Sequence, residues 1–143
     1  MLCHPLVSPL SAKSWAGSPP IYIGTGTELL TDEDKCLAQA AARHGVAVIF
    51  EEYQAMPHCF AMVLEALPAS RLFFKRWSDF MTLVVERNVP LETKGVCIKP
   101  KTLQEVSLDL NNLMSFTEDE IRSRMRARVK ELSEKNPDPL SKL

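Results

Sequence analysis

The distribution of apolar residues predicts two buried strands near the start of the chain. Residues 21–23 and 46–50 are short runs of apolar, β-prone side chains. Each run is apolar at consecutive positions rather than at alternate ones, which is typical of a parallel strand covered on both faces. The Pro19-Pro20 pair lacks two backbone donors, so the first strand is expected to begin at Ile21. The Gly-Thr-Gly sequence at residues 24–26 is expected to end it.

A helix is predicted between these two strands. Thr31 can cap its first turn, and Asp34 three residues later completes an imperfect capping box. Gly45 is expected to end the helix in a left-handed backbone conformation. A strand, a helix and a strand within about thirty residues form a βαβ unit, whose two strands are parallel.

Two further helices are predicted after the second strand. The first covers residues 60–67 and ends near Pro68, and the second is capped by Ser70 and runs to about Arg87. The second helix carries an apolar stripe at helical spacing, which we interpret as part of the core; its members are Phe73, Trp77, Phe80, Met81 and Val84.

The remainder of the chain is less regular. Residues 88–116 show no clear period, and only residues 96–98 indicate a strand. The capping box at residues 117–120 predicts a helix that extends to about Glu134, followed by a frayed tail at 136–139. Arginines flank the apolar stripe of this helix, so a solvated amphipathic helix is the simplest interpretation, with binding to a membrane surface or an acidic partner as the alternative. We therefore divide the chain into a first region at 1–87 and a second at 88–143.

The composition of the chain limits the kinds of partner and environment that we expect. The chain has 143 residues and a formal net charge of −1, so no overall positive field draws it to nucleic acid or anionic lipid. No stretch approaches the roughly 20 apolar residues of a membrane-spanning helix, and the first residues do not form a signal peptide. None of the four cysteines forms a Cys-x-x-Cys pair, so the spacing excludes a zinc ribbon and a thioredoxin-like site. We interpret all four as reduced thiols; the compartment is unknown from the sequence, with a cytoplasmic location favoured.

The candidate chemistry lies just after the two predicted strands. Glu28 follows the first strand and His58 follows the second. Because parallel strands end at the same edge of a sheet, both side chains are expected to lie at one rim. A carboxylate bound to one imidazole nitrogen fixes the tautomer and leaves the other nitrogen as a general base. This chemistry requires no metal and no organic cofactor.

Simpler interpretations of these residues stay open at this point. A histidine in a loop is more often an ordinary surface residue, and Glu28 is equally compatible with a loop carboxylate close to a helix start. Asp32 is a second candidate for the acid, but it lies in the first helical turn and faces the helix dipole rather than the rim.

The order and spacing of several motifs resemble a known family. Ser-Pro-Leu at 8–10, the segment at 19–24, Glu-Leu-Leu-Thr-Asp-Glu at 28–33 and Met-Pro-His-Cys-Phe at 56–60 resemble the C-terminal part of fold-3 α/β-hydrolases, the hormone-sensitive-lipase-like esterases. The resemblance covers roughly residues 5–67 and is faint to about 87. It implies an α/β fold: the C-terminal part of a parallel hydrolase sheet, with flanking helices and a C-terminal helical extension.

The resemblance also implies a function and its residues. In this family a Ser-acid-His triad hydrolyses carboxylic esters through an acyl-enzyme, and Glu28 and His58 take the acid and histidine positions. The acid is usually aspartate, and the residue after the histidine is usually glycine where this chain has Cys59. Neither the Gly-x-Ser-x-Gly nucleophile elbow nor the His-Gly-Gly oxyanion loop occurs in the sequence; both are expected before residue 1.

Two functional hypotheses follow. In the first, the chain is part of a serine esterase that acts on small-molecule esters, and it is inactive without the nucleophile. In the second, it is a non-catalytic interaction module derived from a hydrolase fold. Two parallel strands alone would leave an open sheet edge, so self-association through that edge is also expected.

Overall fold

The computed structural model describes residues 3–86 and 91–135, which fall into two compact units. Among the described residues, the larger unit comprises 14–86 and 91–114, and the smaller one combines 3–13 with 115–135. The expected frayed tail at 136–139 and the expected helix end at Arg87 lie outside the described residues.

The larger unit is built on a four-stranded sheet with the order β1-β2-β3-β4. The strands β1 (Ile21–Gly26), β2 (Val48–Tyr53) and β3 (Lys94–Ile98) are parallel, and β4 (Glu105–Leu108) is antiparallel to β3. The predicted parallel pair is present, with Ile21 opposite Val48 and Gly26 opposite Tyr53. This mostly parallel sheet with flanking helices confirms the α/β class.

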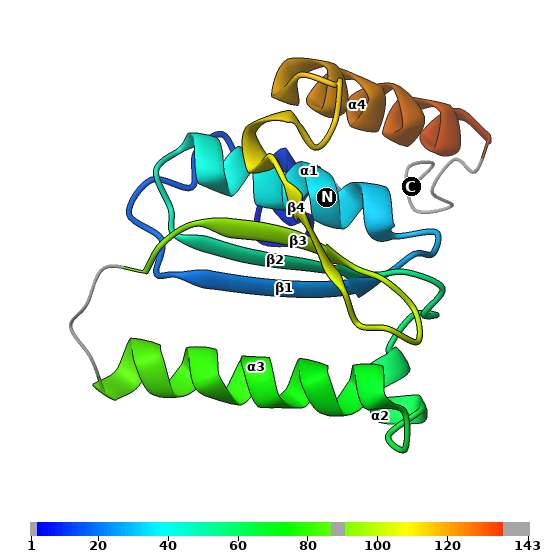
Figure 1. The fold of residues 1–143 in the computed structure, drawn as a ribbon. Coiled ribbons are helices and arrows are strands. Elements are labelled where there is room, and N and C mark those ends of the chain that lie inside the picture. Colours follow the sequence, from blue (N-terminus) through cyan, green and yellow to red (C-terminus); the bar gives the residue numbers. More distant parts are fainter. Residues whose placement is uncertain (1–2, 87–90, 136–143) are drawn as a thin grey trace. The chain divides into compact units, whose positions relative to one another are not determined.

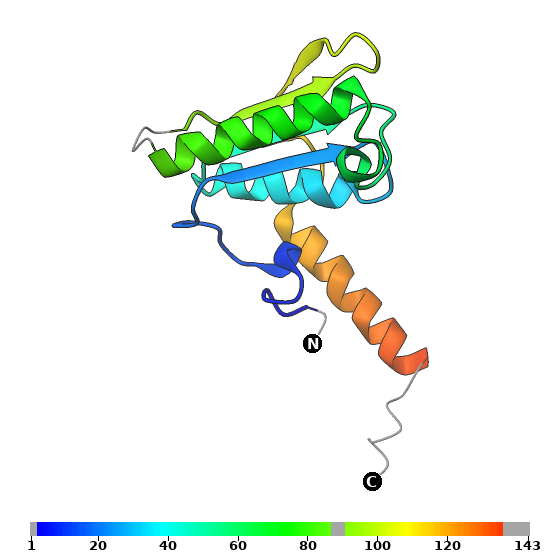
Figure 2. The same cartoon turned by 90° about the horizontal axis from the view of Figure 1, so that it is seen from below.

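Two helices cover opposite faces of the sheet (Figure 1). The helix α1 (Thr31–Arg43) lies on one face, and α3 (Pro68–Glu86) lies on the other, with the short α2 (Phe60–Val63) leading into it. Figure 2 shows α3 running along the strands rather than across them. A 3-10 turn, η2 (Leu110–Asn112), follows β4.

Each face of the sheet has its own buried cluster. The cluster beneath α1 contains Ala38, Ala41, Val46, Val48, Phe50 and Leu110. The cluster beneath α2 and α3 contains Tyr53, Phe60, Ala61, Ala69, Val96 and Ile98. Members of both clusters come from β2, which explains why its sequence is apolar at consecutive positions.

Several predicted boundaries were wrong, for local reasons. Gly24 lies within β1, which continues to pair with β2 and ends at Gly26. Pro68 begins α3 instead of ending α2, which suits a residue whose missing N–H is harmless in a first helical turn. Ser70 is fully buried, and its hydroxyl donates to the Leu64 carbonyl oxygen at 2.7 Å rather than capping a helix.

The predicted apolar stripe of α3 is only partly a core element. Phe73 packs between Tyr22 and Phe60, with ring centroids 5.8 and 5.7 Å away. Trp77 and Met81, by contrast, are 45% and 50% exposed. Part of the stripe therefore remains in contact with solvent.

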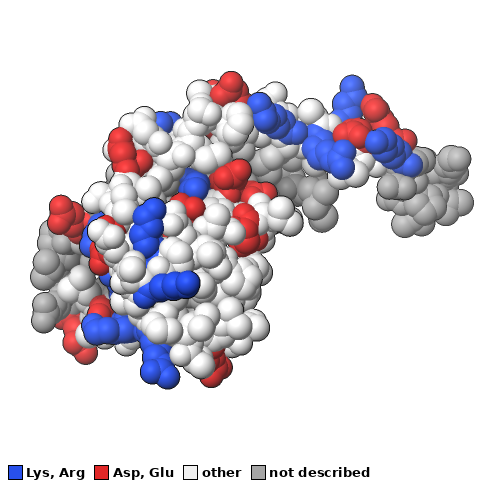
Figure 3. Space-filling model, turned by 45° about the vertical axis from the view of Figure 1, so that its right-hand side comes forward, with Lys and Arg blue, Asp and Glu red and all other residues white. Residues whose placement is uncertain are grey.

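The smaller unit contains η1 (Pro9–Ser11) and α4 (Glu118–Lys135). The predicted capping box is present: the Glu120 N–H donates to the Thr117 hydroxyl at 3.2 Å, and the Thr117 N–H donates to the Glu120 carboxylate at 2.8 Å. No described residue of α4 is buried. Figure 3 shows basic and acidic side chains interspersed along it, and several are paired within the helix, including Arg128 with Glu131 at 2.6 Å.

Candidate functional site

The loops after β1 and β2 bring Glu28 and His58 together. His58 Nδ1 lies 3.2 Å from Glu28 Oε1. The His58 side chain is 62% exposed, whereas that of Glu28 is 15% exposed. The acid is therefore largely enclosed, while the imidazole is accessible to a substrate. Asp32, the second acid candidate, is an exposed residue in the first turn of α1.

The Glu28 carboxylate is oriented by the backbone as well as by His58. Its second oxygen, Oε2, accepts the Leu30 N–H at 3.0 Å. This bond, followed by the contact with His58, holds the pKa of the Glu28 carboxyl below its usual value. A carboxylate with one oxygen on a backbone amide and the other on an imidazole is ionised and fixed in direction.

Thr31 supports the loop that carries Glu28. Its hydroxyl accepts the Glu28 N–H at 2.7 Å and lies 2.6 Å from the Gly26 carbonyl oxygen. The predicted capping box with Asp34 was wrong, because the Asp34 N–H donates to the Leu30 carbonyl instead. The threonine that looked like a helix cap is in fact the residue that closes the acid loop.

Gly26 allows the two loops to approach one another. A Cβ atom at this position would lie 2.1 Å from the Met56 carbonyl oxygen, far inside contact distance. The loop that leads to His58 therefore passes directly over the end of β1, and only glycine leaves room for it. From the sequence we expected Gly26 to mark the end of a strand, and its role in the packing of the two loops was not predicted.

The far side of the His58 loop is anchored by α2. Phe60 is 3% exposed and packs against Tyr53, with ring centroids 4.9 Å apart. Cys59, which stands between His58 and Phe60 in the sequence, is exposed and adopts a left-handed backbone conformation with a φ of 54°. This conformation is the physical reason that glycine suits the position after the histidine.

A hollow of about 350 Å³ adjoins His58. Its lining includes Gly24 and Gly26 from β1, and Phe73, Phe74 and Trp77 from α3. The hollow is therefore bounded by the outer edge of the sheet and an aromatic wall. An apolar group of a substrate held there would lie beside the imidazole.

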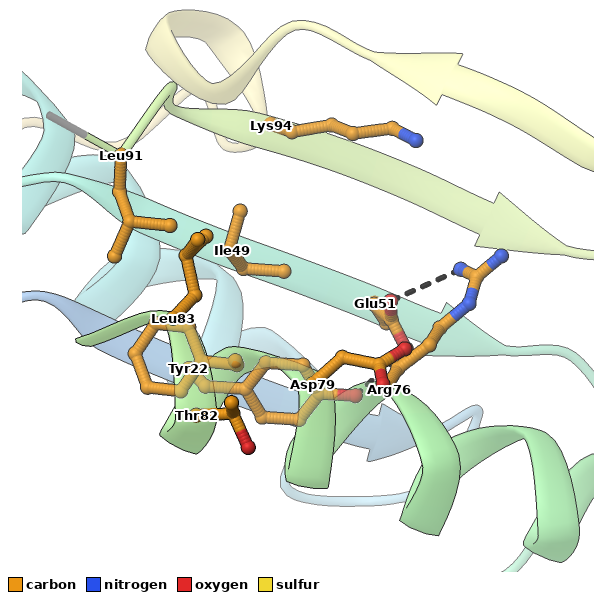
Figure 4. A pocket seen from close by; sticks show the side chains of 10 residues that line it. Tyr22, Ile49, Glu51, Arg76, Asp79, Thr82, Leu83, Leu91 and Lys94 are labelled. Carbon is orange, nitrogen blue, oxygen red and sulfur yellow. Dashed lines mark hydrogen bonds and ion pairs between the residues drawn. The ribbon is translucent and has the colours of Figure 1, made fainter. Parts of the chain in front are cut away.

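A second polar cluster lies between α3 and the sheet (Figure 4). The buried Glu51 carboxylate accepts the hydroxyls of Tyr22 and Tyr53 at 2.8 and 2.6 Å and the Arg76 guanidinium at 2.9 Å. Arg76 also pairs with Glu105 on β4. This cluster borders a cavity of about 550 Å³. The sequence did not indicate it, because its members are distant along the chain.

Among residues 3–86 and 91–135, no three His, Cys, Asp or Glu side chains gather as a metal site. Within the same residues, no helix has the length and apolar character needed to cross a membrane. The four cysteines are free thiols.

Comparison with known proteins agrees with this geometry. Residues 1–62, which include both Glu28 and His58, match the model of a family described as alpha/beta hydrolase fold. Residues 1–62 are therefore similar to a portion of an α/β-hydrolase, and the expected resemblance to the fold-3 group is confirmed.

One curated protein also matches part of this chain. An acetyl-hydrolase of Streptomyces hygroscopicus is 39% identical over 69 residues, which is 48% of this chain and 23% of that protein. The match thus spans less than a quarter of the relative's length. No solved structure matches the chain.

Proposed function

We propose that Glu28 and His58 are the acid and base of a Ser-acid-His triad that hydrolyses carboxylic esters. The observation that carries this proposal is the 3.2 Å contact between His58 Nδ1 and Glu28 Oε1, at the carboxyl ends of two parallel strands. The serine would come from polypeptide that is not in the printed sequence, because no Gly-x-Ser-x-Gly occurs in it.

The proposed mechanism moves one proton through His58. With Nδ1–H donating to Glu28, Nε2 accepts the proton of the serine hydroxyl as that oxygen attacks the ester carbonyl. Glu28 stabilises the imidazolium, which then gives the proton to the leaving alcohol. In the second half, Nε2 takes a proton from the water that attacks the acyl-enzyme, and the carboxylic acid is released with the serine restored.

The proposed substrate is a small ester whose apolar part enters the hollow beside His58. Its aromatic wall, from Phe73 to Trp77, suits an acyl or aryl group. The name of the Streptomyces relative refers to acetyl groups, which would fill only part of this hollow.

A chimera tests this proposal. Residues 1–62, which match the hydrolase family and contain Glu28 and His58, would replace the homologous segment of the Streptomyces acetyl-hydrolase, and the rest of that enzyme would be the source of the proposed nucleophile. We expect the chimera to hydrolyse p-nitrophenyl acetate or butyrate, and His58→Ala to lower kcat by at least about a thousandfold. His4→Ala serves as the matched control, because His4 is an exposed histidine that belongs to the smaller unit. A chimera that keeps its activity after His58→Ala would overturn the proposed role.

The isolated 143-residue chain is expected to show no turnover of either ester. The exposed thiol of Cys59 can react once with the ester to form an acyl adduct, and this single reaction must be distinguished from turnover. Turnover by the isolated chain that disappears in His58→Ala would contradict the need for a separate serine.

A non-catalytic interaction module is the second candidate function. The observation that favours it is the apolar surface of α3, where Met81 and Val85 are 50% and 80% exposed, next to the sheet edge at β1. In this case the chimera would lack activity although it folds, and the surface of α3 would be the binding region.

A further inference from the structure

A second cavity lies on the other side of the His58 loop, at the carboxyl ends of β2 and β3. Its volume is about 440 Å³, within the range of roughly 300–1,000 Å³ typical of small-molecule sites. Tyr53 and Ile98, each 1% exposed, are among the residues that line it. The carboxyl ends of parallel strands are the usual place for ligands in an open α/β sheet.

The walls of this cavity are mostly apolar. Met56 contributes from the loop after β2, Leu67 and Ala69 from the start of α3, and Leu103 from the turn after β3. No aspartate or glutamate lines it. An aliphatic chain is therefore the kind of group that these walls would remove from water.

The turn that borders the cavity is held in a fixed conformation. The Lys99 N–H donates to the Gln104 carbonyl at 2.9 Å, and the Leu103 N–H donates to the Lys99 carbonyl at 3.1 Å. Lys101 and Leu103 have positive φ angles of 63° and 55°, as does Ala55 on the opposite loop at 60°. Non-glycine residues rarely adopt this conformation, and such backbone concentrates at ligand sites.

The charge at the cavity is positive. Lys99 and Lys101 both line it, and within the described part of the chain neither forms an ion pair with a carboxylate. Two ammonium groups beside an apolar cavity complement a ligand that carries an anionic group at the end of an aliphatic chain.

From these features we infer that the cavity binds an aliphatic carboxylate, such as a medium-chain fatty acid. The chain would lie among Met56, Leu67 and Leu103, and the carboxylate would accept hydrogen bonds from Lys99 and Lys101. This site uses neither Glu28 nor His58, so it does not depend on the proposed hydrolase function. Three of the elements that form it, α3, β3 and the turn after β3, lie beyond the residues that match the hydrolase family.

Isothermal titration of the full 143-residue chain with octanoate tests the inference. We expect saturable binding at one site, and binding of octanol, which has the same chain without the charge, about tenfold weaker. The Lys99→Gln/Lys101→Gln double variant should also bind octanoate about tenfold more weakly. The matched control is Lys75→Gln/Lys130→Gln, which removes two positive charges outside the cavity and should leave binding unchanged.

The apolar part of the site is tested by Leu67→Trp, which should abolish binding by filling the cavity. Leu67 is 36% exposed, so the larger ring can be accommodated without disturbing the core, and circular dichroism would verify the fold. Equal affinity for octanol and octanoate, unchanged binding in the double lysine variant, or no saturable binding of octanoate to the folded chain would each overturn the inference. His58→Ala should bind octanoate normally, which separates this result from the outcome of the chimera experiment.

Discussion

Glu28 receives two donors, and their relative effects on its pKa can be measured. The Leu30 N–H is the larger cause of the lowered pKa, and His58 adds to it. The side chain therefore does not depend on His58 alone for its ionised state. This arrangement would keep the acid of the proposed triad charged whether the imidazole is protonated or neutral.

Carbon-13 NMR titration of the Glu28 carboxyl should show this order. We expect a pKa below the ordinary glutamate value of about 4.3, a partial rise in His58→Ala, and a larger rise in Leu30→Pro, which removes the N–H donor. Because the folded-state pKa is lowered, the stabilisation is present above the ordinary value and is lost as the pH falls through the lowered one. A larger rise in His58→Ala than in Leu30→Pro would contradict the structure.

The left-handed backbone conformation of Cys59 leads to a prediction about stability. A left-handed backbone conformation destabilises a non-glycine residue by about 1–2 kcal/mol. Replacing it with glycine removes this strain, but glycine also loses more conformational entropy on folding, which offsets part of the stabilisation. We expect Cys59→Gly to raise the free energy of unfolding by about 0.5–1 kcal/mol, measured by urea denaturation. Since Cys59 is exposed, little packing would be lost.

The matched control for this substitution is Cys36→Gly. Cys36 lies within α1, where glycine should instead lower the free energy of unfolding by about 1 kcal/mol. If both variants were destabilised alike, the left-handed backbone at Cys59 would not be a source of strain.

At the scale of secondary-structure elements, Glu51 connects α3 to the sheet. It accepts a tyrosine from β1, a tyrosine from its own strand and Arg76 from α3. Burial and the neighbouring Glu51 carboxylate raise the pKa of both Tyr22 and Tyr53. These two are the only tyrosines in the chain, so their ionisation can be followed without interference.

Alkaline titration should therefore report on this cluster. Unfolded tyrosines ionise near pH 10, whereas the folded chain should keep both hydroxyls protonated at that pH. Because the folded-state pKa is raised, the stabilisation is complete below about pH 10 and is lost as the pH rises further. We expect the tyrosinate absorbance to appear only together with loss of the circular dichroism signal. A reversible ionisation near pH 10 in a chain that stays folded would show that the hydroxyls are not held by Glu51.

At the scale of the whole molecule, β1 is an edge strand of the sheet, with no strand beyond it among the described residues. β1 pairs with β2 on one side and is the first strand in the sheet order. Backbone groups alternate between the two edges of a strand, and the Ile21 N–H points to the Ala47 carbonyl on the β2 side. Tyr22 and Gly24 therefore turn their N–H and C=O groups to the outer edge, which can pair with another strand.

We expect the isolated chain to self-associate through this edge and the adjoining apolar surface of α3. Analytical ultracentrifugation over a range of concentrations should show dimers or larger species. Trp77→Lys/Met81→Lys should shift the chain toward monomer by placing charges on the exposed stripe. Leu6→Lys, a change of an apolar side chain that is 90% exposed outside this surface, is the control. A wild-type chain that stays monomeric at every concentration would refute the expectation.

Sequence patterns were sufficient for the elements that depend on neighbours in the chain. The apolar runs placed β1 and β2, the 3.6-residue period placed α3, and the capping box placed the start of α4. From these, parallel pairing alone predicted that Glu28 and His58 lie at one edge. The antiparallel strand β4 was missed, because its pairing with β3 leaves it largely exposed and without a clear apolar pattern.

The sequence by itself determined the βαβ unit, the α/β class and the two loops from which the acid and the histidine emerge, because those features follow from local periodicity and from the direction of parallel strands. Only the tertiary structure decided that Thr31 closes the acid loop, that Gly26 lies beneath the His58 loop and that Glu51 connects α3 to the sheet. Each of these depends on atoms that are distant along the chain or on the path of a loop, and neither composition nor spacing encodes such distances.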